Sequence, residues 1–195
     1  DTPTVTGYLV KDSQWTTVEK PFPRVVYQRE GSYKYDIYAD LMTRGVKMYQ
    51  DVSTLKTVTN KIKCGEVIKS TGIYTPETKE YSAENLMAII ETKSGCFLKP
   101  IYGQLGDGAI RVDSNLTVKC KDYEREGDIN DLIQRVGDAI EMCELEPEDF
   151  LVQELVDMPT YKNATFDARV MIQKDGAGKI VYGAERARVG GAGKI

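Results

Sequence analysis

The sequence predicts an α+β fold whose second half is a mainly antiparallel sheet. Three patterns indicate this class. Short β-branched runs alternate with segments of helical spacing up to about residue 93. Beyond residue 94 the strand patterns pair as hairpins across polar or glycine-containing turns. One long amphipathic helix interrupts these hairpins. We therefore divide the chain into an N-terminal βα region, 1–93, and a second region, 94–195.

The first region reads as two short strands, a β-branched core strand, a helix, another strand and two further helices. Gly45 and Gly72 are expected to end the first and second helices, and Ser53 to cap the second. A turn at 75–78 precedes the last helix. The expected elements are 7–10, 15–19, 23–27, 36–44, 46–49, 53–72 and 83–93.

The second region begins with a strand that ends in proline and continues into a glycine-rich loop. Asp128 is expected to cap the helix between the hairpins, whose apolar face would comprise Ile129, Leu132, Ile133, Val136 and Ile140. The expected strands are 96–100, 109–113, 116–121, 150–156, 166–174 and 179–189, and the loop is 103–108.

Composition excludes several classes of function. The 195 residues contain no histidine, which excludes Ser-His and Cys-His nucleophiles and His-ligated metals. The four cysteines are far apart, which argues against a zinc or redox motif and favours free thiols. A net charge of -4 gives no argument for nucleic acid, and no apolar run approaches the ~20 residues of a membrane span. No secretory signal is visible, so we expect a cytoplasmic protein.

Lys99 stands at a strand end, just before the loop Gly103–Gly108. A lysine supplies a point charge, and glycines let main-chain N–H groups approach phosphate oxygens closely. No Gly-Lys-Ser/Thr follows, so this is not a Walker A loop. Taken alone, the pattern is more typical of an ordinary hairpin turn.

Two more segments carry candidate residues. The strand at 150–156 turns polar at Gln153-Glu154, which could meet a purine edge, although a half-buried strand with a solvated edge is the commoner case. In the last hairpin, charged residues alternate with small or apolar ones, so one face would gather Asp167, Arg169, Arg186 and Arg188. A salt-bridged outer face is common, but this density of arginine favours binding of phosphoryl or carboxylate oxygens.

The order of these motifs resembles that of the ATP-grasp superfamily. Within this superfamily the resemblance is greatest to the spore-coat-associated YheC/YheD-like group. The resemblance extends over roughly residues 7–195. Each motif is loose, but seven occur in the right order. They are Asn60-Lys61, Tyr74–Thr78, Leu98–Pro100, the loop to Gly108, Val152–Glu154, Phe166–Arg169 and Arg186–Gly190.

The resemblance implies two subdomains with ATP between them, and amide formation from a carboxylate and an amine through an acyl-phosphate. It implies that Mg²⁺ and arginines stabilise the transferring group. The implied contacts are Lys61 and Lys99 to the phosphates; Gly103, Gln104, Gly106 and Gly108 in a lid; Gln153, Glu154 and the main chain of Val156 to adenine; Asp167 to the ribose or phosphates; and Arg169, Arg186 and Arg188 to the phosphates and acyl-phosphate.

Three departures accompany the resemblance. Asn60 replaces the usual Asp before the first lysine, and Asp107 puts an acid in the loop. The family's magnesium ligands, an acid and a Glu-x-Asn motif, are expected beyond Ile195, so we assign no metal ligand in this chain. We expect it to be a fragment that is inactive alone.

Two other functions stay open. One is a non-catalytic nucleotide-binding or spore-coat-associated interaction protein. The other is a β domain that binds a polyanion, which the net charge of -4 disfavours. The carboxylate, the amine and the oligomeric state do not follow from the sequence.

Overall fold

The computed structural model describes residues 4–28, 35–121 and 123–190. The chain divides into two compact units. The first comprises Asp1–Ile73 with Tyr102–Gln104, and the second comprises Tyr74–Ile101 with Leu105–Ile195. Each unit is described by itself below.

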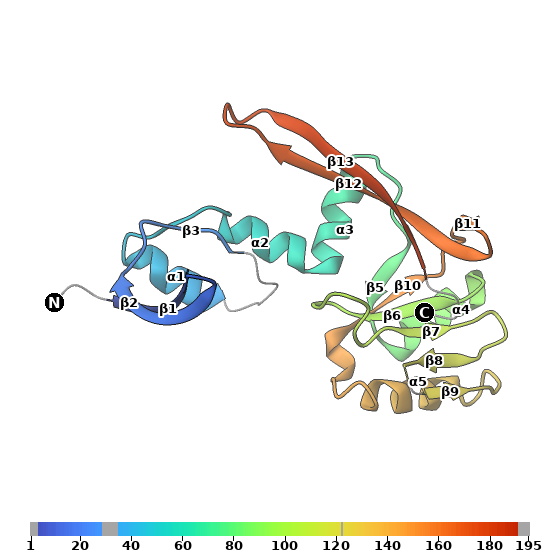
Figure 1. The fold of residues 1–195 in the computed structure, drawn as a ribbon. Coiled ribbons are helices and arrows are strands. Elements are labelled where there is room, and N and C mark those ends of the chain that lie inside the picture. The colour runs from blue at the N-terminus through green and yellow to red at the C-terminus, as the bar shows by residue number, and fades with distance from the viewer. Residues whose placement is uncertain (1–3, 29–34, 122, 191–195) are drawn as a thin grey trace. The chain divides into compact units, whose positions relative to one another are not determined.

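The first unit opens with an antiparallel hairpin of β1 (Thr4–Lys11) and β2 (Gln14–Pro21) (Figure 1). Its two turn residues, Asp12 and Ser13, have φ values of 50° and 62°. Positive φ at both positions gives the turn a twist that matches the twist of the flanking strands. The two strands expected here are confirmed, and each is longer at both ends.

A short parallel pair follows, formed by β3 (Val25–Val26) and β4 (Lys47–Met48), with α1 (Tyr35–Thr43) between them in sequence. Val25 is 53% exposed, so the expectation of a core strand at 23–27 was wrong. The paired segment has only two residues on each side, too few to bury an apolar face.

Asn60 divides the expected helix 53–72 into α2 (Val52–Thr59) and α3 (Lys61–Ser70). Its backbone is extended, and its side-chain oxygen accepts hydrogen bonds from the amides of Ile62 and Lys63. Asparagine favours such a cap because it satisfies amides that have no partner within the helix. The cap of α2 is Asp51 rather than Ser53, whose hydroxyl donates to the Asp51 carboxylate.

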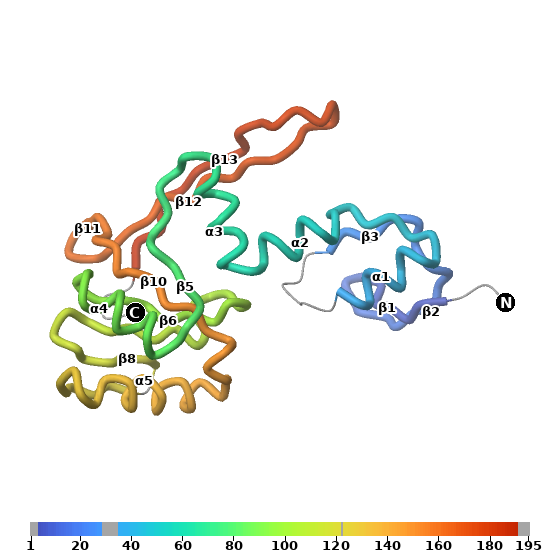
Figure 2. Tube along the Cα trace, turned by 180° about the vertical axis from the view of Figure 1, so that it is seen from behind, coloured from blue at the N-terminus to red at the C-terminus, as the bar shows by residue number. Residues whose placement is uncertain are grey.

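The second unit contains a six-stranded sheet in the order β5-β10-β6-β7-β8-β9 (Figures 1 and 2). Every neighbouring pair is antiparallel, as the sequence predicted for this region. The strands are β5 (Thr78–Glu80), β6 (Cys96–Pro100), β7 (Ile110–Val112), β8 (Val118–Cys120), β9 (Tyr123–Arg125) and β10 (Phe150–Glu154).

One face of this sheet carries the core, packed under α4 (Ala83–Thr92) and α5 (Leu132–Glu141). Side chains alternate between the faces of a strand, so every second residue of β6, β7 and β8 is buried. The core thus joins α4 to β6, across the expected division near residue 94. The fully buried members include Leu86, Ile89, Leu98, Ile110, Val112, Val118, Leu132 and Val136.

The expected start of α5 was wrong. The helix begins at Leu132, and Asp128 instead accepts a hydrogen bond from the amide of Asn130. Ile129 therefore precedes the helix and is 40% exposed. The buried guanidinium of Arg135 holds this segment close to α5, because it donates a hydrogen bond to the Asp128 carbonyl.

A three-stranded sheet ends the second unit, formed by β11 (Thr160–Tyr161), β12 (Ala164–Lys174) and β13 (Ile180–Val189). The last two strands form the expected long hairpin, with an irregularity between Met171 and Ile172. All four cysteines are free thiols, and each is buried or half-buried. Among the described residues, no helix is long and apolar enough to cross a bilayer.

Candidate functional site

A row of polar and aromatic side chains crosses the face of the six-stranded sheet opposite the core. The strand register places these residues next to one another, one from each strand. In the order of the strands they are Thr78, Gln153, Phe97, Arg111, Lys119 and Glu124. The core covers the other face, so these side chains lie outside the core.

Lys99 lies on the same face as Phe97, two residues further along β6. Its ammonium donates a 2.7 Å hydrogen bond to Gln153 Oε1 and lies 5.0 Å from the centre of the Phe97 ring. Burial lowers the pKa of Lys99. No ion pair within the described part of the chain involves Lys99. A half-buried cation with a neutral partner is suited to an anionic ligand.

Gln153 connects Lys99 to β5. Because an ammonium can only donate, the side-chain oxygen of Gln153 faces Lys99 and its amide nitrogen faces away. That nitrogen donates to Thr78 Oγ1 at 2.8 Å, and the Thr78 hydroxyl in turn donates to the Pro76 carbonyl. Both ends of the Gln153 amide are thereby held.

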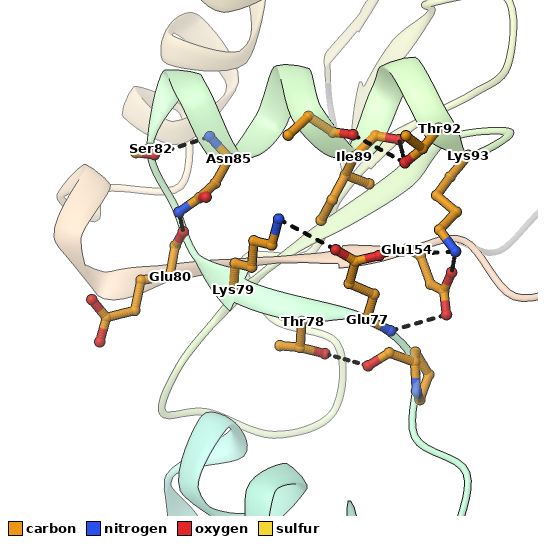
Figure 3. Close-up of polar contacts among 12 residues, drawn as sticks. Glu77, Thr78, Lys79, Glu80, Ser82, Asn85, Ile89, Thr92, Lys93 and Glu154 are labelled. Atoms are coloured by element: carbon orange, nitrogen blue, oxygen red, sulfur yellow. Dashed lines mark hydrogen bonds and ion pairs between the residues drawn. The ribbon is translucent and has the colours of Figure 1, made fainter.

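Glu154 follows Gln153 in β10 and points to the opposite, helix-covered face (Figure 3). Its carboxylate accepts hydrogen bonds from the Tyr74 hydroxyl at 2.7 Å and the Glu77 amide at 2.9 Å. Lys93, the C-terminal cap of α4, lies 2.7 Å away. The Lys93 ammonium and the other two donors lower the pKa of Glu154 to about 2. The side chain is 10% exposed, and these three groups of the second unit engage it.

The main chain at the end of β10 and just beyond it is partly hydrogen-bonded as well. The Glu154 amide donates to the Glu77 carbonyl at 2.9 Å, and the Leu155 amide donates to the Gly95 carbonyl at 3.0 Å. Val156, the residue expected to meet adenine through its main chain, is 37% exposed.

Lys61 begins α3 in the first unit and donates a 3.1 Å hydrogen bond to the Gly103 carbonyl. The neighbouring Asn60 donates through its amide to the Tyr102 hydroxyl. Gly103, Gly106 and Gly108 all have positive φ, as a tight loop requires. Gln104 and Asp107 are exposed.

The four candidate residues of the last hairpin lie as alternation predicted. Asp167 is opposite Arg188, and Arg169 is opposite Arg186. Two nitrogens of the Arg188 guanidinium donate hydrogen bonds to the Asp167 carboxylate, with Nε 2.7 Å from Oδ1. This guanidinium lowers the pKa of Asp167. Neither Arg169 nor Arg186 takes part in an ion pair with any of the described residues.

Sequence reasoning missed Lys93 and Phe97 as members of this site, and it named Tyr74 and Thr78 only within a motif, without a role. For Phe97 a signal existed, because it shares the period-two face of Lys99. Lys93 and Tyr74 carry no local pattern that points to Glu154. For metals, residues 4–28, 35–121 and 123–190 contain no group of three or more Asp, Glu, Cys or His side chains arranged to hold an ion.

Comparison with known proteins gives matches in family, sequence and structure. A family model described as "YheC/D like ATP-grasp" matches residues 53–195. The chain is 25% identical over 206 residues to the endospore coat-associated protein YheD of Bacillus subtilis (strain 168). That match includes 98% of this chain but 45% of the relative, so the chain spans less than half of the relative's length.

Solved structures with the same fold include two synthetases. D-alanyl-alanine synthetase A from Vibrio cholerae O1 biovar eltor str. N16961 matches with a TM-score of 0.62 and 13% identity, over 97% of this chain and 53% of that one. N5-carboxyaminoimidazole synthetase from Staphylococcus aureus, complexed with ADP, matches with a TM-score of 0.56 and 11% identity, over 84% of this chain and 38% of that one. At such identities the likeness establishes the fold alone, and it confirms the predicted fold class.

Proposed function

Because this chain belongs to the YheC/D-like ATP-grasp family, we propose that it binds ATP through the face of the second unit that carries Lys99. One observation carries the proposal. The Lys99 ammonium is half-buried, lies beside a neutral amide and takes part in no ion pair with the described residues. A phosphate oxygen would supply the missing negative charge through a charge-assisted hydrogen bond.

The family pattern alone assigns further residues to the same ligand. By that pattern Lys61 would supply a second cation, and the loop from Gly103 to Gly108 would supply main-chain amides for phosphate oxygens. On the last hairpin, Arg169 and Arg186 suit oxygens of the phosphates and of an acyl-phosphate. Asp167 holds Arg188, and we assign it to the ribose or phosphates only through the family pattern.

We further propose that the protein serves the formation of an amide from a carboxylate and an amine. Bound ATP would supply the phosphoryl group that activates the carboxylate. Lysines and arginines would then orient the phosphates and offset the charge that develops on them. Mg²⁺ takes most of its ligands from phosphates and water in such sites. The described residues contain no acidic cluster suited to it, so we assign it no ligand.

A second candidate function is nucleotide binding without turnover. The relative in Bacillus subtilis is named for its association with the endospore coat, and no reaction is stated in that name. Release of ADP in the presence of amino acids would favour the ligase. Binding of ATP without ADP release, in a protein extended to the relative's full length, would favour the second candidate.

Calorimetric titration of ATP tests the binding itself. Lys99→Met should weaken ATP binding by about 1.5–3 kcal/mol, the value of a hydrogen bond to a charged group. Lys119→Met is the matched control, because Lys119 lies on the same sheet face but pairs with Glu124 at 2.9 Å. Equal affinities of the two variants for ATP would refute the phosphate role of Lys99.

A further inference from the structure

Glu154 lies at the centre of a network that connects α4 to the site on the opposite face of the sheet. Lys93 reaches the Glu154 carboxylate from the end of α4, and the Glu77 amide reaches it from the segment that precedes β5 (Figure 3). The Tyr74 hydroxyl reaches it from the same segment. Glu154 thus fixes this segment against the end of β10. The next residue of the segment is Thr78, whose hydroxyl accepts the hydrogen bond of the Gln153 amide.

The contacts form an unbroken series from Lys93 to Lys99. Glu154 holds Glu77, Thr78 follows Glu77 and orients Gln153, and Gln153 accepts the hydrogen bond of Lys99. The orientation of the Gln153 amide matters at the last step. If Thr78 moved, the amide could turn its N–H groups toward the ammonium, and two donors would then face each other.

We propose that Glu154 is a positioning residue, which sets the place of the Lys99 ammonium through Thr78 and Gln153 and does not contact the adenine ring. Lys93 and Tyr74 share this role, because they hold the carboxylate in place. The inference rests on the proposed binding of ATP at Lys99. It replaces the contact with adenine that the family pattern implied for the Glu154 side chain.

The chemistry of the carboxylate favours positioning over base recognition. Three donors surround it, and its pKa of about 2 keeps it ionised and accepting at neutral pH. A purine amino group would have to enter a mostly buried place where three charge-assisted contacts already occupy three of the roughly four lone-pair sites of the carboxylate. Alternation along β10 also directs Glu154 away from the face that carries Lys99.

The first test needs no nucleotide. The pKa of Lys99 is measured by NMR titration of its side-chain nitrogen in the wild type, Glu154→Gln, Lys93→Met and Tyr74→Phe. Loss of the network should release the Gln153 amide, which would then turn its N–H groups toward the ammonium. Two facing donors disfavour the charged form, so the pKa of Lys99 should fall further below its ordinary value. Lys79→Met is the matched control, because Lys79 pairs with Glu77 at 3.3 Å but does not reach Glu154. An unchanged Lys99 pKa in all three variants would overturn the proposal.

The second test uses affinity for nucleotides. Glu154→Gln should weaken ATP and GTP by the same factor, about fivefold, as expected for one poorly placed hydrogen-bond donor. In a Lys99→Met background the same change should have no further effect, because the group that it positions is gone. Additive losses, or a changed ATP-to-GTP ratio, would contradict positioning. Absence of ATP binding by the wild type would refute the proposed function instead, and the NMR titration would still decide the role of Glu154.

Discussion

Arg169 and Arg186 lie directly opposite each other on β12 and β13, two like charges on an exposed hairpin. Like charges in facing positions destabilise a strand pair. The neighbouring pair, Asp167 and Arg188, has opposite charges and joins through two hydrogen bonds. An anion between the two arginines would offset their repulsion.

We predict that Arg186→Ala weakens ATP binding, because it removes one of the two arginines of this hairpin that we assign to the phosphates. The expected loss is about 1 kcal/mol, since both arginines are solvent-exposed. Lys179→Ala is the matched control, since it removes the same charge at the turn of the same hairpin. Calorimetry in low salt measures both variants. A similar loss in Lys179→Ala would indicate only a general effect of charge.

ATP should bind better than GTP. The exocyclic amino group of adenine donates a hydrogen bond, whereas guanine carries an accepting oxygen at that position. With the Glu154 carboxylate engaged by its own neighbours, we assign this preference to main-chain acceptors near Val156. A difference of about tenfold corresponds to one well-made hydrogen bond. Competition between the two nucleotides measures it, and equal affinity would count against an adenine site.

The stability of the chain should fall in acid through Glu154. Its folded-state pKa is about 2, below the ordinary value. A lowered pKa means that the ionised carboxylate stabilises the fold at pH values above about 4.3, and that this contribution disappears as the pH falls toward 2. Thermal unfolding should therefore show wild type more stable than Glu154→Gln near pH 6, with the gap closing by pH 2. A gap independent of pH would contradict this assignment.

Gly95→Ala should destabilise the second unit by about 2–3 kcal/mol, through strain and overpacking. Its φ is +143°, and an added Cβ would lie 2.4 Å from the Val112 carbonyl oxygen. Because Gly95 also accepts from the Leu155 amide, the end of β10 should shift. Gly176→Ala is the control: nothing lies within 4 Å of its Cβ position, so a change within about 0.5 kcal/mol is expected. Chemical denaturation compares the two.

The sequence by itself determined the α+β class, the three hairpins and the strand that carries Lys99 and ends at Pro100. These features depend on local periodicity and turn residues, which a linear pattern contains. It also placed Asp167, Arg169, Arg186 and Arg188 on one face of the last hairpin, because alternation needs no knowledge of distant partners. The break at Asn60 was missed, because the apolar spacing continued across it while its side chain capped the second helix.

Only the tertiary structure decided what each polar side chain of β10 meets. Tyr74 and Glu154 are 80 residues apart in the chain, and Lys99 and Gln153 are 54 apart. Their contacts depend on the strand register and on the packing of α4 against the sheet. Both are set by the burial of a shared core, which is a property of the whole unit. For this reason the sequence pattern predicts Glu154 as a ligand for adenine, whereas in the structure its carboxylate pairs with Lys93.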